Sequence, residues 1–333
     1  MGKPLKLLVV SDIHYAGPEE QTRVGYEGRT STNPIQRLFL KLYRDNLWLK
    51  DPLAHNHFLD WFFEMCGSAD LVVANGDFSC DSGFIGLADD AAFQSAEICL
   101  DKLRGQFGRK LYETMGDHEL GKKSLVGGAG GLRLESFRRC VDRLKLKRFW
   151  KIKRGPYVVM GVTSTLIALD AMIREGLAGE QEEWRALRDQ HIAEIDAAFQ
   201  KLERGERVIL FCHDPTALPF LAQIPSVRSQ WGRIEQTVLG HLHSQFILNT
   251  AYRIGGITPE VNFAGMTISR ITRALRKVKS WDPFKVVLCP SPTGIQAFKD
   301  GGFLTVDLDL EDPAPLDWQV HRIPWTGPPS PLG

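Results

Sequence analysis

The chain has 333 residues, and its 41 Lys plus Arg against 40 Asp plus Glu give a formal net charge of +1. This near-neutral balance argues against a general nucleic-acid binder, because such proteins concentrate positive charge. The 43% hydrophobic and 24% charged content is typical of a soluble globular protein with a substantial core. No apolar run approaches the length of a membrane span.

Cysteine usage and the N-terminus bear on the compartment. The six cysteines show no Cys-x-x-Cys spacing. The first expected strand begins at about residue 5, which leaves no room for a secretory signal. We therefore expect reduced thiols and a cytoplasmic protein.

Apolar runs and helical spacings alternate along the chain. They predict strands at 6–10, 71–74, 157–162, 166–170, 208–211, 236–239, 286–289, 303–308 and 318–323. They predict helices at about 57–66, 88–106 and 180–203. In the last of these, His191 shares the apolar spacing of Trp184 and Phe199, and we expect it to be a partly buried helix residue rather than a ligand.

Three segments lie outside this pattern in an expected single domain at 1–323, which a Pro/Gly-rich tail at 324–333 follows. They are an insertion at about 18–57 with near-helical apolar spacing from 35 to 48, an insertion at about 122–155, and a basic amphipathic segment at about 268–285. Residues 133–154 include ten basic and two acidic side chains. Either the apolar stripes pack on the core beneath solvated charges, or the segments form a basic rim with apolar edges.

Five short motifs place carboxylate and imidazole side chains at the ends of apolar runs. They are Asp12-Ile13-His14, Gly76-Asp77, Gly116-Asp117-His118-Glu119, His213 and Gly240-His241-Leu242-His243. Because alternate side chains share one face of a strand, we expect Asp12 and His14 to point to one metal, and we apply the same logic to the last motif. Imidazole and carboxylate together suit zinc, iron and manganese better than calcium or magnesium.

From residue 12 to residue 243 the motif order resembles that of the calcineurin-like metallophosphoesterases: Asp-x-His, Gly-Asp, Gly-Asn-His-Asp/Glu, His, Gly-His-x-His. The resemblance implies an α/β fold, a four-layer αββα sandwich of two mixed β-sheets flanked by helices. It implies two divalent metal ions (Mn, Fe or Zn, with Mn favoured). Asp12, His14 and His243 would bind the first ion; Asp117, His213 and His241 would bind the second; Asp77 would bridge both.

The resemblance also implies a reaction. A hydroxide held between the ions would hydrolyse a phosphodiester, pyrophosphate or phosphomonoester. His118 would stabilise the transferring phosphoryl group or protonate the leaving oxygen. Glu119 would orient the His118 ring or cap the following turn, and Asp81 would either tether its loop or be a plain turn residue.

Asp117 departs from the family pattern, which has Asn at this position. Two divalent ions, Asp12, Asp77 and one hydroxide sum to a charge of about +1, and Asp117 brings the sum to about 0. We therefore expect tighter binding of the second metal and weaker activation of an anionic phosphate.

Several functional classes remain open within this superfamily. A basic rim with apolar edges, including Arg133, Arg138, Arg273 and Arg276, would suit a phosphorylated lipid at a membrane surface. In this character the chain resembles the UDP-diacylglucosamine pyrophosphatases of lipid A synthesis. A non-catalytic binding module of the same fold is a second alternative. A nuclease is disfavoured by the near-neutral charge, and a Ser/Thr protein phosphatase by the absence of Gly-Asp-x-x-Asp-Arg-Gly.

Overall fold

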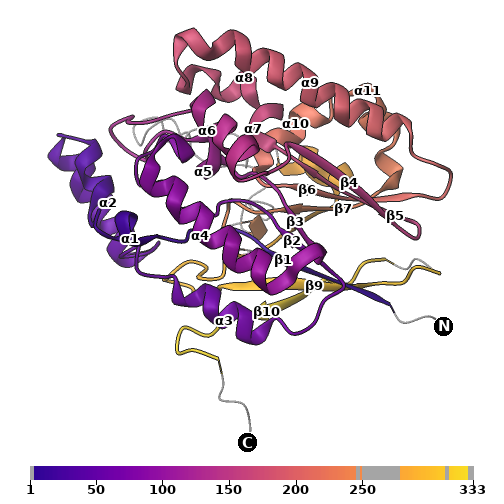
Figure 1. Ribbon diagram of the computed structural model, residues 1–333, viewed down its shortest axis with the longest axis horizontal. Coiled ribbons are helices and arrows are strands. Elements are labelled where there is room, and N and C mark those ends of the chain that lie inside the picture. The colour runs from indigo at the N-terminus through magenta and orange to yellow at the C-terminus, as the bar shows by residue number, and fades with distance from the viewer. Residues whose placement is uncertain (1–3, 245–247, 250–277, 312–314, 329–333) are drawn as a thin grey trace, which may run out of the picture.

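The computed structural model describes residues 4–244, 248–249, 278–311 and 315–328. Within these residues two five-stranded sheets pack against each other, with strand orders β10-β9-β1-β2-β3 and β4-β5-β6-β7-β8 (Figure 1). The strands are β1 (Leu5–Val10), β2 (Leu71–Ala74), β3 (Leu111–Glu113), β4 (Phe149–Arg154), β5 (Tyr157–Val162), β6 (Arg207–Cys212), β7 (Ile234–Leu239), β8 (Val286–Leu288), β9 (Gly302–Leu308) and β10 (Gln319–Arg322).

Both sheets are mixed, and each contains a run of parallel strands. In the first, β1, β2 and β3 are parallel, whereas β9 and β10 continue the sheet in antiparallel pairing. In the second, β5 to β8 are parallel and β4 is an antiparallel edge strand. The carboxyl ends of parallel strands meet at one edge of a sheet, so the loops that follow them are neighbours.

Helices cover the outer faces of the sandwich. They are α1 (Pro18–Gln21), α2 (Pro34–Asn46), α3 (His57–Met65), α4 (Asp90–Phe107), α5 (Asp117–Leu120), α6 (Leu134–Arg138), α7 (Ser164–Ile167), α8 (Leu169–Met172), α9 (Gln181–Gln200), α10 (Leu218–Leu221) and α11 (Pro225–Ser229). Helices α3 and α4 lie on the side of the first sheet, and α9 lies on the side of the second (Figure 1). The four-layer αββα sandwich of two mixed sheets is confirmed.

Strand periodicity divides the core into layers. On β1, Leu7 and Val9 belong to the apolar cluster between the sheets, together with Phe211 of β6. Leu8 and Val10 point the other way, into the cluster that includes Phe62 of α3. Both faces of each central strand are therefore buried, which explains why these strands appear in the sequence as continuous apolar runs.

Most of the predicted elements are present, with shifts at their ends. The expected helices correspond to α3, α4 and α9, and the near-helical spacing at 35–48 corresponds to α2. The predicted strand at 166–170 is wrong, because these residues belong to α7 and α8. Residues 164–167 are buried on all sides, and a short apolar run of this kind fits a buried helix as well as a strand.

The segment at 122–155 is not purely an insertion. It ends in β4, which pairs along its length with β5 and buries Trp150 between the sheets. Lys151 and Lys153 alternate with this residue and face outward, so the basic pattern arises here from a half-buried edge strand. No helix in the described part of the chain is both long and apolar enough to cross a membrane.

Candidate metal centre

The loops that carry the five motifs follow β1, β2, β3, β6 and β7 at their carboxyl ends. The expectation that alternation along a strand aligns these side chains is wrong, because β1 ends at Val10 and β7 ends at Leu239. Asp12, Asp77 and His241 instead have backbone φ values of 56°, 59° and 63°. Non-glycine residues seldom adopt this left-handed conformation, and it is maintained where the surroundings over-determine it.

Backbone hydrogen bonds between the loops fix this conformation. The amide of Asp12 donates to the carbonyl of Gly76 at 3.0 Å, and the amide of His14 donates to the carbonyl of Asp77, also at 3.0 Å. The amide of His241 donates to the two carboxylate oxygens of Asp12 at 2.9 and 3.1 Å. Hydrogen bonds within the protein therefore hold the first, second and fifth motifs together without any metal.

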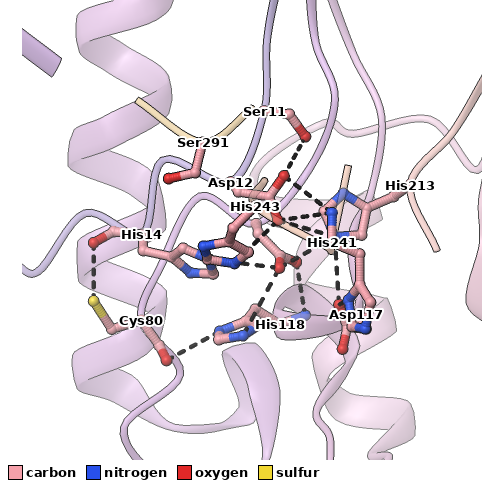
Figure 2. A network of polar contacts seen from close by, with 12 residues as sticks. Ser11, Asp12, His14, Cys80, Asp117, His118, His213, His241, His243 and Ser291 are labelled. Atoms are coloured by element: carbon pink, nitrogen blue, oxygen red, sulfur yellow. Dashed lines mark hydrogen bonds and ion pairs between the residues drawn. The ribbon is translucent and has the colours of Figure 1, made fainter. Parts of the chain in front are cut away.

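The motif side chains converge into two adjoining groups and a third, His14 with Asp77 and His118, that overlaps both. Asp77, Asp117, His213 and His241 form one, and Asp12, His14 and His243 form the other, with the ligand-type atoms of each group within 4.8 Å of one another. Figure 2 shows the labelled carboxylates and imidazoles of both groups pointing toward a common centre.

Asp77 lies between the two groups. Its Oδ2 is 3.1 Å from Nε2 of His213 and 3.8 Å from Nε2 of His14. This oxygen is buried and has no hydrogen-bond partner in the part of the chain that the structure describes. A buried carboxylate oxygen is costly to leave unmatched, and a cation on either side of it would remove that cost.

Three imidazoles are held in one tautomer by backbone carbonyls. The pairs are His14 Nδ1 with Ser79 O at 3.3 Å, His118 Nδ1 with Cys80 O at 3.0 Å and His213 Nδ1 with Asn75 O at 2.6 Å. A carbonyl can only accept, so each Nδ1 carries a hydrogen and each Nε2 is directed into the centre. Metal-binding histidines are typically oriented in this way.

The spacing of two ring nitrogens also fits a shared ion. Nε2 of His14 and Nε2 of His243 are 3.0 Å apart (Figure 2). Two nitrogens that each lie about 2.1 Å from one ion, at a right angle, are separated by about 3.0 Å. The residues present therefore fit a pair of divalent cations.

The pKa shifts show where the centre is most negative. Burial alone would lower the pKa values of His213 and His241, yet both are raised, the first by Asp77 and Asp12 and the second by Asp117. The field that favours a proton on these rings also favours a metal cation between them. Burial would raise the pKa of Asp77, but His213 and His118 hold it below its ordinary value.

In the group of Asp12, His14 and His243, burial outweighs the neighbouring carboxylates. Burial lowers the pKa of His14, an effect that Asp77 and Asp12 only partly offset. Burial, followed by the neighbouring His14, holds the pKa of His243 well below its ordinary value. Both rings are therefore neutral at physiological pH, which is the form in which imidazole binds a metal.

Glu119 ties two motif loops together rather than orienting the His118 ring. Its carboxylate accepts from the amides of Asp77 at 2.9 Å, Phe78 at 2.7 Å and Gly116 at 2.7 Å. The last bond also caps the first turn of α5. Burial, with Asp77 nearby, raises the pKa of Glu119 to about 7.

Asp81 tethers its loop, which was one of its two expected roles. Oδ1 of Asp81 accepts from the amide of Gly86 at 2.8 Å. The residue is buried, and this burial raises the pKa of its carboxyl well above the ordinary value.

A recess of about 150 Å³ opens beside the two groups. Its lining includes His14, His118, His241 and His243, along with residues of the 18–57 segment such as Tyr43 and Trp48. The ring of Trp48 lies 4.9 Å from that of His243, measured between centroids. The insertion at 18–57 therefore forms one wall of the site.

The basic side chains that line this recess are not those that the sequence pointed to. Arg133 and Arg138 are absent from its lining, and Arg138 donates to both carboxylate oxygens of Glu183 at 2.9 Å. Arg273 and Arg276 lie outside the described residues, as does most of the segment at 268–285. The basic residues in the lining are Arg44, Lys122 and Lys123.

Lys122 and the three backbone carbonyls are the participants that sequence reasoning missed. Nζ of Lys122 lies 3.2 Å from Oδ2 of Asp117. Lys122 follows Asp117 by five residues, but nothing in the spacing of the motifs marks it. The carbonyls of Asn75, Ser79 and Cys80 carry no side-chain signal at all.

A larger cavity lies elsewhere in the molecule. It measures about 950 Å³ and lies between α9 and α11, where Arg188, Ile192, Phe220 and Gln230 line it. None of the candidate metal groups found among the described residues includes a side chain from this lining. Size alone therefore does not identify the site.

Gly116 provides a test of the close packing in the centre. A Cβ added there would lie 2.1 Å from Oδ1 of Asp77, so Gly116→Ala should lower bound Mn²⁺ and destabilise the fold by about 1–3 kcal/mol. Gly105 lies within α4, and a Cβ added there meets nothing within 4 Å. Gly105→Ala should therefore raise the free energy of unfolding by about 0.5–1 kcal/mol. Thermal melts and metal analysis measure both, and full metal content in Gly116→Ala would contradict the packing.

Comparisons with known proteins give distant structural matches only. No family model and no curated protein matches the chain. A dimetal phosphatase from Danio rerio aligns at 14% identity and a TM-score of 0.47, covering 96% of this chain and 99% of that one. A phosphopantetheinyl hydrolase from Mycobacterium tuberculosis aligns at 14% identity and a TM-score of 0.36, covering 73% and 84%.

The purple acid phosphatase PPD1 from yellow lupin seeds aligns at 10% identity and a TM-score of 0.38. The alignment covers 100% of this chain and 58% of the lupin protein. At this level of similarity we base the function on the residues of the site itself.

Proposed function

We propose that the protein is a dinuclear metal-dependent phosphoric ester hydrolase of the calcineurin-like metallophosphoesterase type. The observation that carries this proposal is the arrangement of two adjoining ligand groups about the buried Asp77 oxygen. When bound, two divalent cations would activate water for attack at phosphorus and neutralise the charge of the phosphate. A phosphodiester, a pyrophosphate and a phosphomonoester all satisfy this chemistry.

The ligand roles follow the two groups. Asp12, His14 and His243 would hold the first ion, and Asp117, His213 and His241 would hold the second. Asp77 would bridge the ions through Oδ2. Mixed carboxylate and imidazole ligands are compatible with manganese, iron or zinc, and we propose manganese as the working metal.

His118 is proposed as the catalytic side chain nearest the reacting phosphate. Its ring lies 4.5 Å from that of His14 between centroids, and its Nε2 is 3.8 Å from Oδ2 of Asp77. The carbonyl of Cys80 fixes the opposite ring nitrogen, so Nε2 faces the recess. Burial, followed by Lys122, holds the pKa of His118 well below its ordinary value.

The compartment forms part of the same proposal. All six cysteines are buried, and each is a free thiol. Reduced thiols suit the cytoplasm, where the proposed enzyme would act.

A hydrolysis panel tests the proposed activity. Metal-free protein reconstituted with Mn²⁺ should hydrolyse at least one of bis-p-nitrophenyl phosphate, p-nitrophenyl phosphate, a cyclic nucleotide or a UDP-linked lipid. Chelation should abolish the turnover, and fresh Mn²⁺ should restore it. A protein that binds two Mn²⁺ ions but hydrolyses none of these would favour the non-catalytic binding module.

Replacing His118 separates catalysis from metal binding. His118→Ala should lower turnover by about 10²-fold or more, because positioned acid–base or charge-stabilising groups contribute at this level. Metal content should stay at that of the wild-type protein. Loss of metal together with activity would instead make His118 a ligand.

A second candidate, a lipid-linked phosphate substrate at a membrane surface, is favoured by α2. Three apolar side chains on consecutive turns of this helix are exposed, Ile35 by 76%, Leu38 by 58% and Leu42 by 54%. Arg37 and Lys41 accompany them on the helix. Exposed apolar residues beside basic ones are typical of helices that lie in a membrane interface.

Behind this helix runs a groove of about 710 Å³, and its lining includes Leu38, Leu40 and Lys41. Tyr26 and Arg44 line both this groove and the metal-site recess. The recess alone is smaller than ordinary ligand pockets of about 300–1,000 Å³, so the rest of a large substrate would extend along the groove.

Vesicle binding distinguishes the lipid candidate from a water-soluble substrate. The protein should co-sediment with anionic vesicles of phosphatidylglycerol and phosphatidylethanolamine. The triple variant Ile35→Ser, Leu38→Ser and Leu42→Ser should bind at least about tenfold more weakly. A matched variant, Leu177→Ser with Val320→Ser, removes exposed apolar residues elsewhere and should bind normally. Absence of wild-type binding would eliminate the membrane-surface candidate.

A further inference from the structure

The two carboxylate oxygens of Asp117 face different partners. Oδ1 lies 3.0 Å from Nδ1 of His241 and 3.4 Å from Nε2 of His213, two members of its own ligand group. Oδ2 lies 3.2 Å from Nζ of Lys122. One oxygen is therefore directed to the second metal position and the other to an ammonium group.

Lys122 places its positive charge inside the site. The residue follows the last turn of α5, and its side chain is only 20% exposed. It lines the recess together with His118 and His241. Lysine is ordinarily charged at neutral pH, and here its Nζ lies beside the carboxylate of Asp117, with which it forms an ion pair.

The contact between Asp117 and Lys122 changes the charge that results from having Asp in place of the family's Asn. Taken alone, a carboxylate in place of Asn lowers the charge of the centre by one. Lys122 raises it by one, so the pair leaves the same total charge that an Asn would leave. The expectation of a tighter second metal and weaker phosphate activation omitted this lysine.

Asn would also fit poorly at this position while Lys122 is present. An amide offers one oxygen and one NH₂ group. With its oxygen directed to His213 and His241, the NH₂ group would face the ammonium of Lys122. Two donors would then oppose each other in a largely buried place, which is unfavourable.

We propose that Asp117 and Lys122 form one functional unit, in which Lys122 is a positioning residue that orients the carboxylate and sets the affinity of the second metal position. The inference rests on the proposed dinuclear site. It identifies a residue pair that must change together, so that neither substitution alone reproduces the family-type centre.

Mn²⁺ titration of metal-free protein by calorimetry tests the unit through a double-mutant cycle. Lys122→Met should tighten the second Mn²⁺ by at least about tenfold, because a nearby positive charge is lost. Asp117→Asn should weaken it by at least about tenfold, because an anionic ligand is lost and the ammonium remains. The double variant should lie within about threefold of the wild type.

Two further variants keep the outcome interpretable. Lys122→Arg retains the charge and should keep wild-type affinity even if Lys122→Met folds poorly. Lys110→Met changes a lysine outside the recess, whose Nζ donates to the carbonyl of Ala69, and should leave the affinity unchanged. Unchanged affinity in folded Lys122→Met, loss of affinity in Lys122→Arg, or a double variant equal to Asp117→Asn would overturn the proposal. A wild-type protein that binds no Mn²⁺ would instead refute the dinuclear site itself.

Discussion

The buried carboxylate of Asp77 is the interaction on which the rest of the site depends. Its amide is held by Glu119 at 2.9 Å, and its Oδ1 accepts from the amide of His118 at 3.0 Å. Its Oδ2 faces His213 and His14. A buried charge is tolerated only when it is matched, and here the matching groups come from three separate loops. Glycine at 116 allows the close approach that this requires.

The fold delivers those loops by a simple topological rule. Parallel strands β1 and β2 of one sheet, and β6 and β7 of the other, end at the same side of the sandwich. The apolar strands supply rigidity, and the polar residues begin only where the strands stop. Left-handed backbone then turns side chains inward that an extended strand would direct alternately to opposite faces, at Asp12, His14, Asp77, His241 and His243. Strain of this kind is concentrated at functional sites, which agrees with the proposed role of the centre.

Much of this was predictable from the sequence, for identifiable reasons. Motifs at strand ends identified which residues meet, because strand ends are marked by apolar runs and the motif order is distinctive.

The left-handed geometry was not predictable, since it depends on hydrogen bonds between loops far apart in the chain. The pairing of Arg138 with Glu183 spans 45 residues, so a run of basic residues could not be recognised as an ion-paired surface. Helix α7 was missed because a fully buried short run carries no period.

Lys122 shows the same limit at the site itself. Its position in the sequence is unremarkable, yet its contact with Asp117 alters the charge that any bound metal pair would experience. Charge sums taken over motif residues alone therefore describe a site incompletely, and the neighbours that complete the sum become known only once the chain is folded.

Anomalous X-ray diffraction from crystals grown with Mn²⁺ tests the central claim most directly. The account predicts two manganese peaks, one within each ligand group, with the Oδ2 atom of Asp77 coordinated to both. A single peak, or manganese bound elsewhere while both groups remain empty, would contradict it.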